Sequence, residues 1–204
     1  MRRNDLLLAE ISPDLVVGDD RLMAADAHVA VDDSALFQHE GIDAARAARR
    51  DGSTREARAE ALGLNGFVES DGEIGVIANG AGLAMATMDL LDAAGLRPAD
   101  FLETGGRITA GLMSGAVNPV LDLPGRRGAF VNLSGGINPM VEAVRGLVAA
   151  VTERRIGIPL VVELLGSEQE EAWALLADAG IVTARGIETE AAVEMLATLV
   201  GEEP

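Results

Sequence analysis

The sequence predicts an α/β protein whose core is a parallel sheet of five strands with helices on both faces. Over residues 64–204, five short apolar runs alternate with five amphipathic helical patterns, an order typical of parallel sheets. Several turns that lead from an apolar run into a helix are rich in glycine, as in layered α/β folds. Hydrophobic residues make up 49% and charged residues 24% of the 204 residues, so the chain can bury a full core.

The N-terminal residues are expected to form a β-hairpin. Short polar turns, one of them strongly acidic, separate apolar runs at residues 6–11, 15–17 and 22–31. If the arms pair, Glu10, Ser12 and Asp26 would converge, and their oxygens are of the kind that Mg²⁺ prefers. A scatter of surface carboxylates in an acidic protein explains the same residues, so both interpretations stay open.

A change in composition marks the boundary between this piece and the main domain. After residue 33 the apolar residues become sparse and Arg, Ala and Asp dominate, which predicts two short exposed helices at residues 42–50 and 55–62. We therefore expect two parts, a hairpin with a helical linker at residues 1–63 and the main domain at residues 64–204.

The elements of the main domain follow from the spacing of its apolar residues. Strands are expected at residues 73–78, 101–103, 129–133, 160–165 and 181–184. Helices are expected at residues 83–94, at 109–117, from Pro139 to Val151, at 168–179 and at 190–199. Asn118-Pro119 is expected to end the second helix, and Ser167 with Glu170 has the spacing of a capping box at the fourth.

Three glycine-rich turns follow the first three strands of this domain. They are Asn79-Gly80-Ala81-Gly82, Gly105-Gly106 and Gly135-Gly136. All three lie at the carboxyl ends of strands, where open α/β sheets bind ligands, and the helix starts beside them offer free N–H groups to an anion. Met85 stands where a G-x-G-x-x-G fingerprint needs its third glycine, and no Walker motif is present. Tight turns that bind nothing are the alternative interpretation.

The composition excludes several classes of function. A net charge of −17 argues against nucleic acid as a partner. All basic residues are arginine, and an acidic surface without lysine is typical of a salt-adapted proteome or of a GC-rich genome. Solvated charged surfaces without a functional meaning explain the charge equally well. No apolar run reaches the ~18 residues of a membrane span. Because the chain also has no cysteine, we expect a cytoplasmic protein with no membrane partner.

Several stretches resemble one known family. N-G-A-G-L-A-M-A-T-M-D at 79–89, F-L-E-T-G-G at 101–106 and V-N-L-S-G-G-I at 131–137 resemble the carboxyl-terminal ligase domain of the succinyl-CoA synthetase β subunit. E-I-S-P at 10–13 and A-L-F at 35–37 match the same family. The resemblance implies a flavodoxin-like CoA-ligase domain, preceded by a small β-hairpin remnant of an ATP-grasp domain.

The resemblance also implies a tricarboxylic acid cycle type of reaction and assigns roles to residues. A separate α-type subunit binds CoA and carries the phosphorylated histidine, which lies between helix N-termini of the two subunits. On this chain, Asn79 matches the contact to the carboxylate substrate. The phosphate-binding loop matches Gly135, Gly136, Ile137 and Asn138, with supporting turns at Gly80, Gly82, Gly105 and Gly106. Ser12 and Asp26 match the two ligands of the Mg²⁺ that accompanies the nucleotide.

The sequence departs from the family at some of these positions. Ser12 replaces an asparagine, Ser134 an aromatic residue and Arg107 a glycine, and Asn138-Pro139-Met140 replaces a basic-Cys-Asp triplet. His28 and His39 lie far from the glycine turns in the sequence, so we expect no catalytic residue on this chain. The part of the ATP-grasp fold that holds the nucleotide has no match here.

Three hypotheses about function follow. The chain is the C-terminal part of a split or truncated β subunit, which uses Mg²⁺ and ATP or GTP only when a separate ATP-grasp fragment supplies the missing half. Alternatively, it is a non-catalytic paralogue that serves as a scaffold subunit for an α-type partner in a hetero-oligomer. The third is a flavodoxin-like binding module of unrelated role.

Overall fold

The computed structural model describes residues 2–11, 14–17, 21–24, 26–42, 54–64, 66–106, 108–136, 139–186 and 188–201. Contacts divide the chain into two units, Met1–Asp51 and Gly52–Pro204, which are described separately below. The helix α2 (Arg55–Ala61) belongs to the second unit. The predicted boundary after residue 63 and the ATP-grasp origin of the first part stay predictions.

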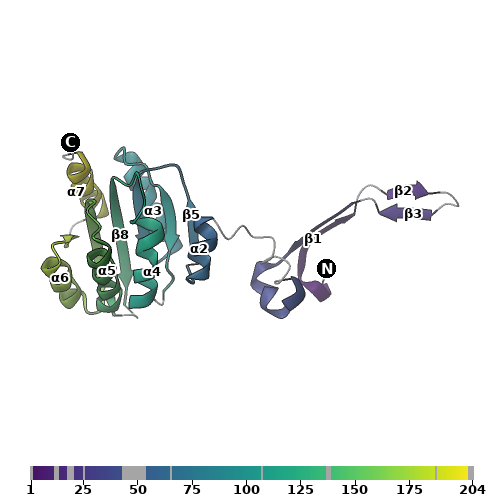
Figure 1. Ribbon diagram of the computed structural model, residues 1–204, viewed down its shortest axis with the longest axis horizontal. Helices are drawn as coiled ribbons and strands as arrows, with labels where there is room; N and C mark the ends of the chain where they lie inside the picture. Colours follow the sequence, from purple (N-terminus) through teal and green to yellow (C-terminus); the bar gives the residue numbers. More distant parts are fainter. Residues whose placement is uncertain are drawn as a thin grey trace. The chain divides into compact units, whose positions relative to one another are not determined.

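The first unit contains the antiparallel hairpin that the sequence predicts (Figure 1). Strand β1 (Leu6–Ile11) pairs with β4 (Ala27–Val31), and β2 (Asp14–Val17) pairs with β3 (Arg21–Ala24). Short 3₁₀ helices, η1 (Arg2–Asn4) and η2 (Asp33–Gln38), accompany the hairpin. His39 Nε2 lies 2.8 Å from Asp5 Oδ2, so this histidine has a local structural partner.

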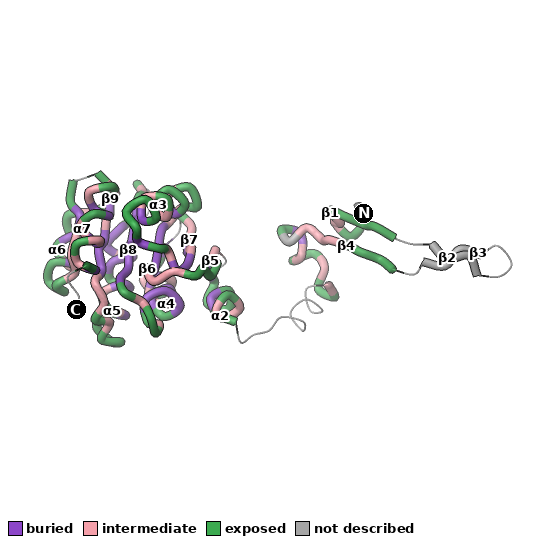
Figure 2. Tube along the Cα trace, turned by 90° about the horizontal axis from the view of Figure 1, so that it is seen from above, coloured by how far each residue is buried: buried purple, intermediate pink, exposed green. Residues whose placement is uncertain are grey.

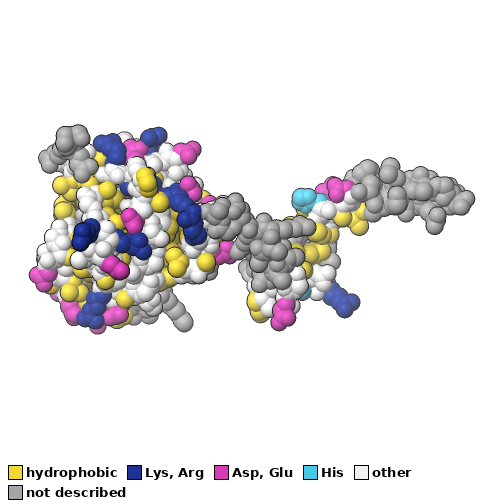
Figure 3. All heavy atoms as spheres, viewed as in Figure 1, with side chains coloured by type: hydrophobic (Ala, Val, Ile, Leu, Met, Phe, Trp, Pro, Cys, Tyr) yellow, Lys and Arg dark blue, Asp and Glu magenta, His cyan; other side chains and the backbone are white. Residues whose placement is uncertain are grey.

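The described part of the first unit leaves much of its apolar surface uncovered. Hydrophobic side chains line the β1–β4 ribbon in Figure 3. The large exposed ones in this unit are Leu7, Leu8, Ile11, Val29 and Phe37, and Phe37 is 80% exposed. A two-stranded ribbon is at best marginally stable alone in water. Such a surface is typical of one that packs against another protein surface.

The second unit is built on a sheet of six strands, one more than the sequence predicts. The strand order is β10-β9-β8-β6-β7-β5, and all neighbours are parallel except β5 and β7. These strands are β5 (Gly66–Glu69), β6 (Ile74–Ala78), β7 (Asp100–Glu103), β8 (Gly128–Gly135), β9 (Leu160–Gly166) and β10 (Val182–Ala184). The five predicted strands are confirmed, and β5 is the strand that the prediction missed.

Helices cover both faces of this sheet, as predicted (Figure 1). Helices α3 (Ala81–Ala93) and α7 (Thr189–Gly201) pack over one face, around the buried Phe130 and Leu91. On the other face lie α4 (Ala110–Val120), α5 (Met140–Arg154) and α6 (Gln169–Asp178), together with α2. Figure 2 shows the buried residues concentrated in the strands and on the inner sides of these helices.

Helix α4 does not end at Asn118-Pro119, which corrects the prediction. It continues through Pro119 to Val120. The fixed φ of Pro119 is compatible with a helix, but proline has no N–H to donate to the carbonyl four residues earlier, so one hydrogen bond is lost. Val117, Pro119 and Val120 are all buried, so packing on the sheet holds the final turn in helical form.

The predicted capping box at α6 is also wrong. The helix begins one residue later than Ser167 requires: its N-cap is Glu168, in a left-handed conformation with φ 59° and no side-chain capping bond. Gln169 instead turns back, and its Oε1 accepts a hydrogen bond of 3.0 Å from the Gly166 N–H.

Helices α4 and α5 approach each other closely at a glycine. A Cβ atom added to Gly146 of α5 would lie 2.1 Å from the backbone oxygen of Ala110 in α4. No side chain fits into that space, because real Cβ contacts are well over 3 Å. The two helices therefore touch backbone to backbone at this point.

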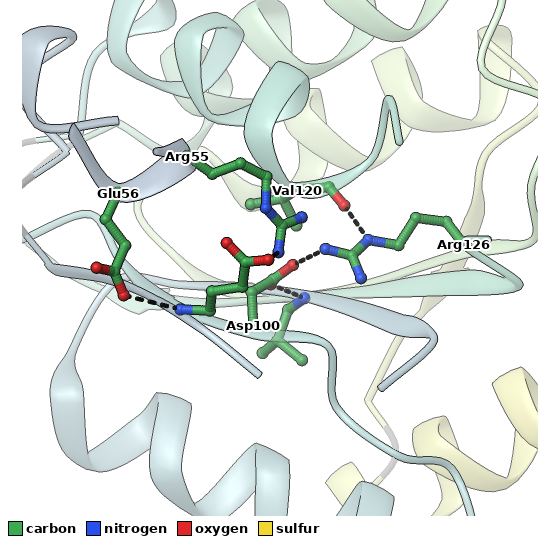
Figure 4. Close-up of polar contacts among 7 residues, drawn as sticks. Arg55, Glu56, Asp100, Val120 and Arg126 are labelled. Carbon is green, nitrogen blue, oxygen red and sulfur yellow. Dashed lines mark hydrogen bonds and ion pairs between the residues drawn. The ribbon is translucent and has the colours of Figure 1, made fainter. Parts of the chain in front are cut away.

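A buried ion pair anchors the edge of the sheet around β7. Figure 4 shows Arg126 between Asp100, with which it pairs, and the carbonyl of Val120, to which its Nε donates at 2.7 Å. Asp100 is fully buried and also accepts a hydrogen bond of 2.9 Å from the Val76 N–H. Burial raises the pKa of Asp100 to about 7, although Arg126 and the Val76 N–H act in the opposite direction.

Helix α2 is tied to the missed strand β5 by a second set of contacts. Arg55 Nη2 lies 2.8 Å from Glu69 Oε1, and its guanidinium is 5.8 Å from the centre of the Phe67 ring. The Glu69 N–H donates to Glu56 Oε1 at 3.3 Å (Figure 4). These contacts explain how β5, with only two large apolar residues, is held as an edge strand.

Among the described residues, no helix combines the length and hydrophobicity needed to cross a membrane.

Candidate functional site

The strand order places the switch point of the sheet between β6 and β8. The chain leaves β6 for β7 on one side and then returns to β8 on the other side. Open α/β sheets bind ligands in the crevice outside the carboxyl ends of two such strands. The turns that begin at Asn79 and Gly135 follow these two strands, and the Gly105-Gly106 turn follows the neighbouring β7. The structure thus brings the three predicted glycine turns to one edge.

The side chain of Asn79 joins two of these turns. Its Nδ2 donates to the Ser134 carbonyl at 2.8 Å, and its Oδ1 accepts from the Ser134 N–H at 2.8 Å. The register pairs Ala78 with Asn132, so the amide of Asn79 continues the β6–β8 ladder just beyond the end of β6. Because an amide nitrogen carries two hydrogens, one N–H of Asn79 still makes no hydrogen bond to any described residue.

The Gly135 end of β8 is also held from the side of β9. The two strands pair in register up to Gly135 and Gly166. Beyond them, the Ser167 N–H donates to the Gly135 carbonyl at 3.2 Å, and the Ser167 carbonyl accepts from the Met140 N–H at 3.0 Å. Met140 is the first residue of α5, so this helix begins a few residues after Gly135-Gly136 rather than directly at it.

The helices that follow the three turns differ in how they begin. Neither α3, with Gly80 at its N-cap, nor α5, with Pro139 there, has a side-chain capping bond. In α4, by contrast, Thr109 Oγ1 accepts a hydrogen bond from the Leu112 N–H at 3.2 Å. The start of α3 therefore keeps its first N–H donors and its positive dipole end for an anion. In α5 the Met140 N–H is already bonded to the Ser167 carbonyl and the Glu142 N–H to the Pro139 carbonyl, so this helix offers fewer free donors.

The open space at these turns fits the approach of a ligand. A Cβ added to Gly82 or Gly136 would meet no atom within 4 Å, and one added to Gly80 would only touch Leu83 Cβ at 4.0 Å. Gly105 has φ +75° and donates its N–H to Glu103 Oε1 at 2.6 Å, which shapes the third turn from within. Gly105 and Gly106 also have no atom within 4 Å of an added Cβ, so all three turns have open space at their glycines.

The structure does not test every predicted site residue at this edge. Ile137, Asn138, Arg107 and Ser12 lie outside the described residues. Asp26 lies in the first unit, where its Oδ1 accepts from the Ala27 N–H at 2.8 Å. It lines a cavity with Leu8, Glu10 and His28. In the part of the chain that the structure describes, no three His, Asp or Glu side chains are grouped to hold a metal, so the Mg²⁺ pair Ser12 and Asp26 stays a prediction.

Sequence reasoning missed four polar residues beneath this edge, on the face covered by α3 and α7. Asn132 is buried and donates from Nδ2 to Thr87 Oγ1 at 3.0 Å. Beside it, Glu163 accepts from Thr189 Oγ1 at 3.0 Å, while its Oε2 is buried without a hydrogen-bond partner. Burial raises the pKa of Glu163. Asn132 and Glu163 are hard to recognise in the sequence because each stands inside an apolar strand.

The fold is that of a flavodoxin-like α/β domain with glycine-rich turns at its switch point. Comparison with known proteins agrees: the family described as CoA-ligase matches residues 77–197. The chain belongs to the CoA-ligase family, as the motif resemblance predicts.

Relatives in this family include β subunits of succinate–CoA ligases. The chain is 38% identical over 203 residues to the ADP-forming β subunit of Acidithiobacillus ferrooxidans, covering 98% of this chain and 51% of that protein. It is 41% identical over 174 residues to β subunit 2 of Streptomyces coelicolor, covering 85% of this chain and 45% of that protein. The chain thus spans about half the length of the curated relatives it matches.

Solved structures share the fold. ATP citrate lyase from Methanothrix soehngenii, in complex with citrate and coenzyme A, superposes with a TM-score of 0.77 over 97% of this chain and 56% of that one, at 15% identity. PH0766 from Pyrococcus horikoshii superposes with a TM-score of 0.56 over 80% of this chain and 43% of that one, at 16% identity. At such low identity these likenesses establish the fold alone.

Proposed function

We propose that the chain is the ligase part of the β subunit of an acyl-CoA synthetase of the succinate–CoA ligase type. Working with an α-type subunit, it takes part in the reaction carboxylate + CoA + NTP ⇌ acyl-CoA + NDP + phosphate, with NTP being ATP or GTP. The phosphoryl group is carried on a histidine of that partner, which also binds CoA. This chain contributes the carboxylate contact and one helix N-terminus.

The single observation that carries this proposal is the switch-point edge. Two turns with open space at their glycines, Gly80 and Gly136, lie beside helix starts that have no side-chain cap. Backbone N–H groups and positive helix ends stabilise a phosphoryl group without any catalytic side chain of their own. The similarity to ADP-forming succinate–CoA ligase β subunits supports the proposed reaction.

Asn79 can still donate a hydrogen bond to a substrate carboxylate, even though its side chain already makes two hydrogen bonds to Ser134. The N–H that makes no hydrogen bond to a described residue is a donor for a carboxylate oxygen in the crevice. The bond from Ser134 to Oδ1 fixes the direction of the amide. Asn79 therefore serves as an orienting contact, and it needs no change of conformation to donate.

The nucleotide half of the reaction is assigned to a separate ATP-grasp fragment. The exposed apolar side chains of the β1–β4 ribbon, such as Leu7, Ile11 and Val29, support the proposal that another protein surface covers this ribbon. Mg²⁺ bound with the nucleotide would neutralise phosphate charge, and by the family match Asp26 is the described residue that would hold it.

A scaffold function is the second candidate, and one observation favours it. The amide of Asn79 is engaged at both its oxygen and its nitrogen by the same backbone residue, which is what a purely structural asparagine would do. In this case the chain keeps the surface for an α-type subunit but supports no turnover.

Reconstitution tests the proposal. The purified chain is mixed with an α-type subunit and an ATP-grasp fragment from the same source, and CoA-dependent NDP release and phosphohistidine are followed. We expect both signals only in the complete mixture. A stable complex without either signal in any combination would refute the ligase function and leave the scaffold.

A further inference from the structure

The turn that links β9 to α6 lies against the Gly135 end of β8, on the side away from β6. The sheet order β9-β8-β6 places Asn79 on one side of β8 and this turn on the other. Ser167 makes two backbone hydrogen bonds there, one to Gly135 and one from Met140. A single residue thus holds both the end of the strand and the first residue of the helix that follows it.

The start of this turn leaves no space for a side chain. Gly166 has φ +153°, and a Cβ at this position would lie 1.8 Å from the Gly135 carbonyl oxygen. The next residue but one, Glu168, has φ 59°, which is rare for a residue other than glycine. Backbone strain of this kind persists only where the surroundings fix the conformation.

One side chain fixes the turn from the helix side. Gln169 Oε1 accepts the N–H of Gly166 at 3.0 Å, which closes the turn over three residues. The side chain of Ser167, by contrast, makes no hydrogen bond to any described residue, although its backbone makes both contacts to β8 and α5. The side chain of Gln169 therefore shapes the turn, whereas the side chain of Ser167 does not.

We infer that the β9–α6 turn is a positioning element for the anion-binding edge, and that Gln169 is its positioning residue. Asn79 fixes Ser134 from the β6 side, and the Gln169-closed turn fixes Gly135 and Met140 from the β9 side. A phosphoryl group held by backbone N–H donors depends on their placement, since a shift of about 1 Å costs on the order of a hundredfold in rate. The catalytic consequence rests on the proposed function, whereas the structural part does not.

Gln169→Leu tests this, with Ser167→Ala as the matched control in the same turn. Hydrogen exchange of the purified chain follows the backbone amides of Ser167 and Met140. We expect Gln169→Leu to increase both exchange rates about tenfold, the effect of losing one hydrogen bond. Ser167→Ala should leave them unchanged, and Gln169→Glu, which keeps an acceptor oxygen, should restore the wild-type protection. Unchanged exchange in Gln169→Leu would overturn the inference.

Kinetics of the reconstituted complex provide the second measurement. Gln169→Leu should lower kcat about tenfold and leave KM for the carboxylate unchanged, because Asn79 and its donor are untouched. If the loss of activity instead matches the loss of folded protein, Gln169 has only a structural role and the positioning of the edge is refuted. If the wild-type complex is inactive in every combination, the proposed function fails, while the exchange rates still decide whether Gln169 holds the turn.

Discussion

Replacement of Asn79 by alanine separates the structural from the catalytic role of this residue. Asn79→Ala removes both 2.8 Å hydrogen bonds to Ser134. Because Ser134 is exposed and water replaces part of the loss, each bond contributes about 0.5–1 kcal/mol. The free energy of unfolding should therefore fall by about 1–2 kcal/mol. With a urea slope of roughly 2 kcal/mol per molar, the midpoint falls by about 0.5–1 M.

Urea denaturation followed by Trp173 fluorescence measures this change, because Trp173 is the chain's one tryptophan and lies in α6 of the second unit. Asn118→Ala is the matched control: Asn118 accepts a single exposed hydrogen bond of 3.4 Å from Arg154, and its midpoint should hardly change. A midpoint shift below about 0.2 M for Asn79→Ala would refute a stabilising role of the two hydrogen bonds to Ser134. When the two hydrogen bonds are lost but the fold is intact, turnover of the reconstituted complex should disappear while the complex still assembles.

Two further predictions concern packing and pH. Gly146→Ala should destabilise the second unit by about 3 kcal/mol or more in the same assay, since its Cβ would meet Ala110 O at 2.1 Å. Gly111→Ala is the matched control: this glycine has open space around it, so alanine should stabilise α4 by about 0.5–1 kcal/mol. The pKa of Asp100 is raised from 3.8 to about 7, so the folded state binds the extra proton and stability falls as pH rises from about 4 to 7. Urea midpoints at pH 5 and pH 8 check this: an equally steep fall in Asp100→Asn would contradict the assignment to Asp100.

Strong apolar periodicity made most of the fold predictable. The five parallel strands and the shared edge of the glycine turns follow from the alternation of apolar runs and helices. Strand β5 could not be found this way, because Phe67 and Val68 are too few to form a pattern and the strand depends on contacts from α2. Pro119 misled the prediction of α4 since burial, a tertiary effect, outweighed its local signal.

The contacts of the candidate site were less accessible to sequence reasoning. Asn79 was recognised by its motif, but its bonds to Ser134 depend on the register of two strands 55 residues apart in the chain. Ser167 was expected to act through its hydroxyl, whereas it acts through its peptide groups. Hydrogen bonds of the backbone leave no trace in residue identity, so only the structure reveals them.

The backbone contact between Gly146 and Ala110 has a mechanical consequence for the switch-point edge. Ala110 is the first residue of α4, close in the chain to the Gly105-Gly106 turn, and α5 begins just after the Gly135-Gly136 turn. Because no side chain lies between them, α5 cannot move toward α4 at this point without displacing the Ala110 backbone. A partner that displaces α4 toward α5 at the Gly105-Gly106 turn would therefore press directly on the backbone of α5.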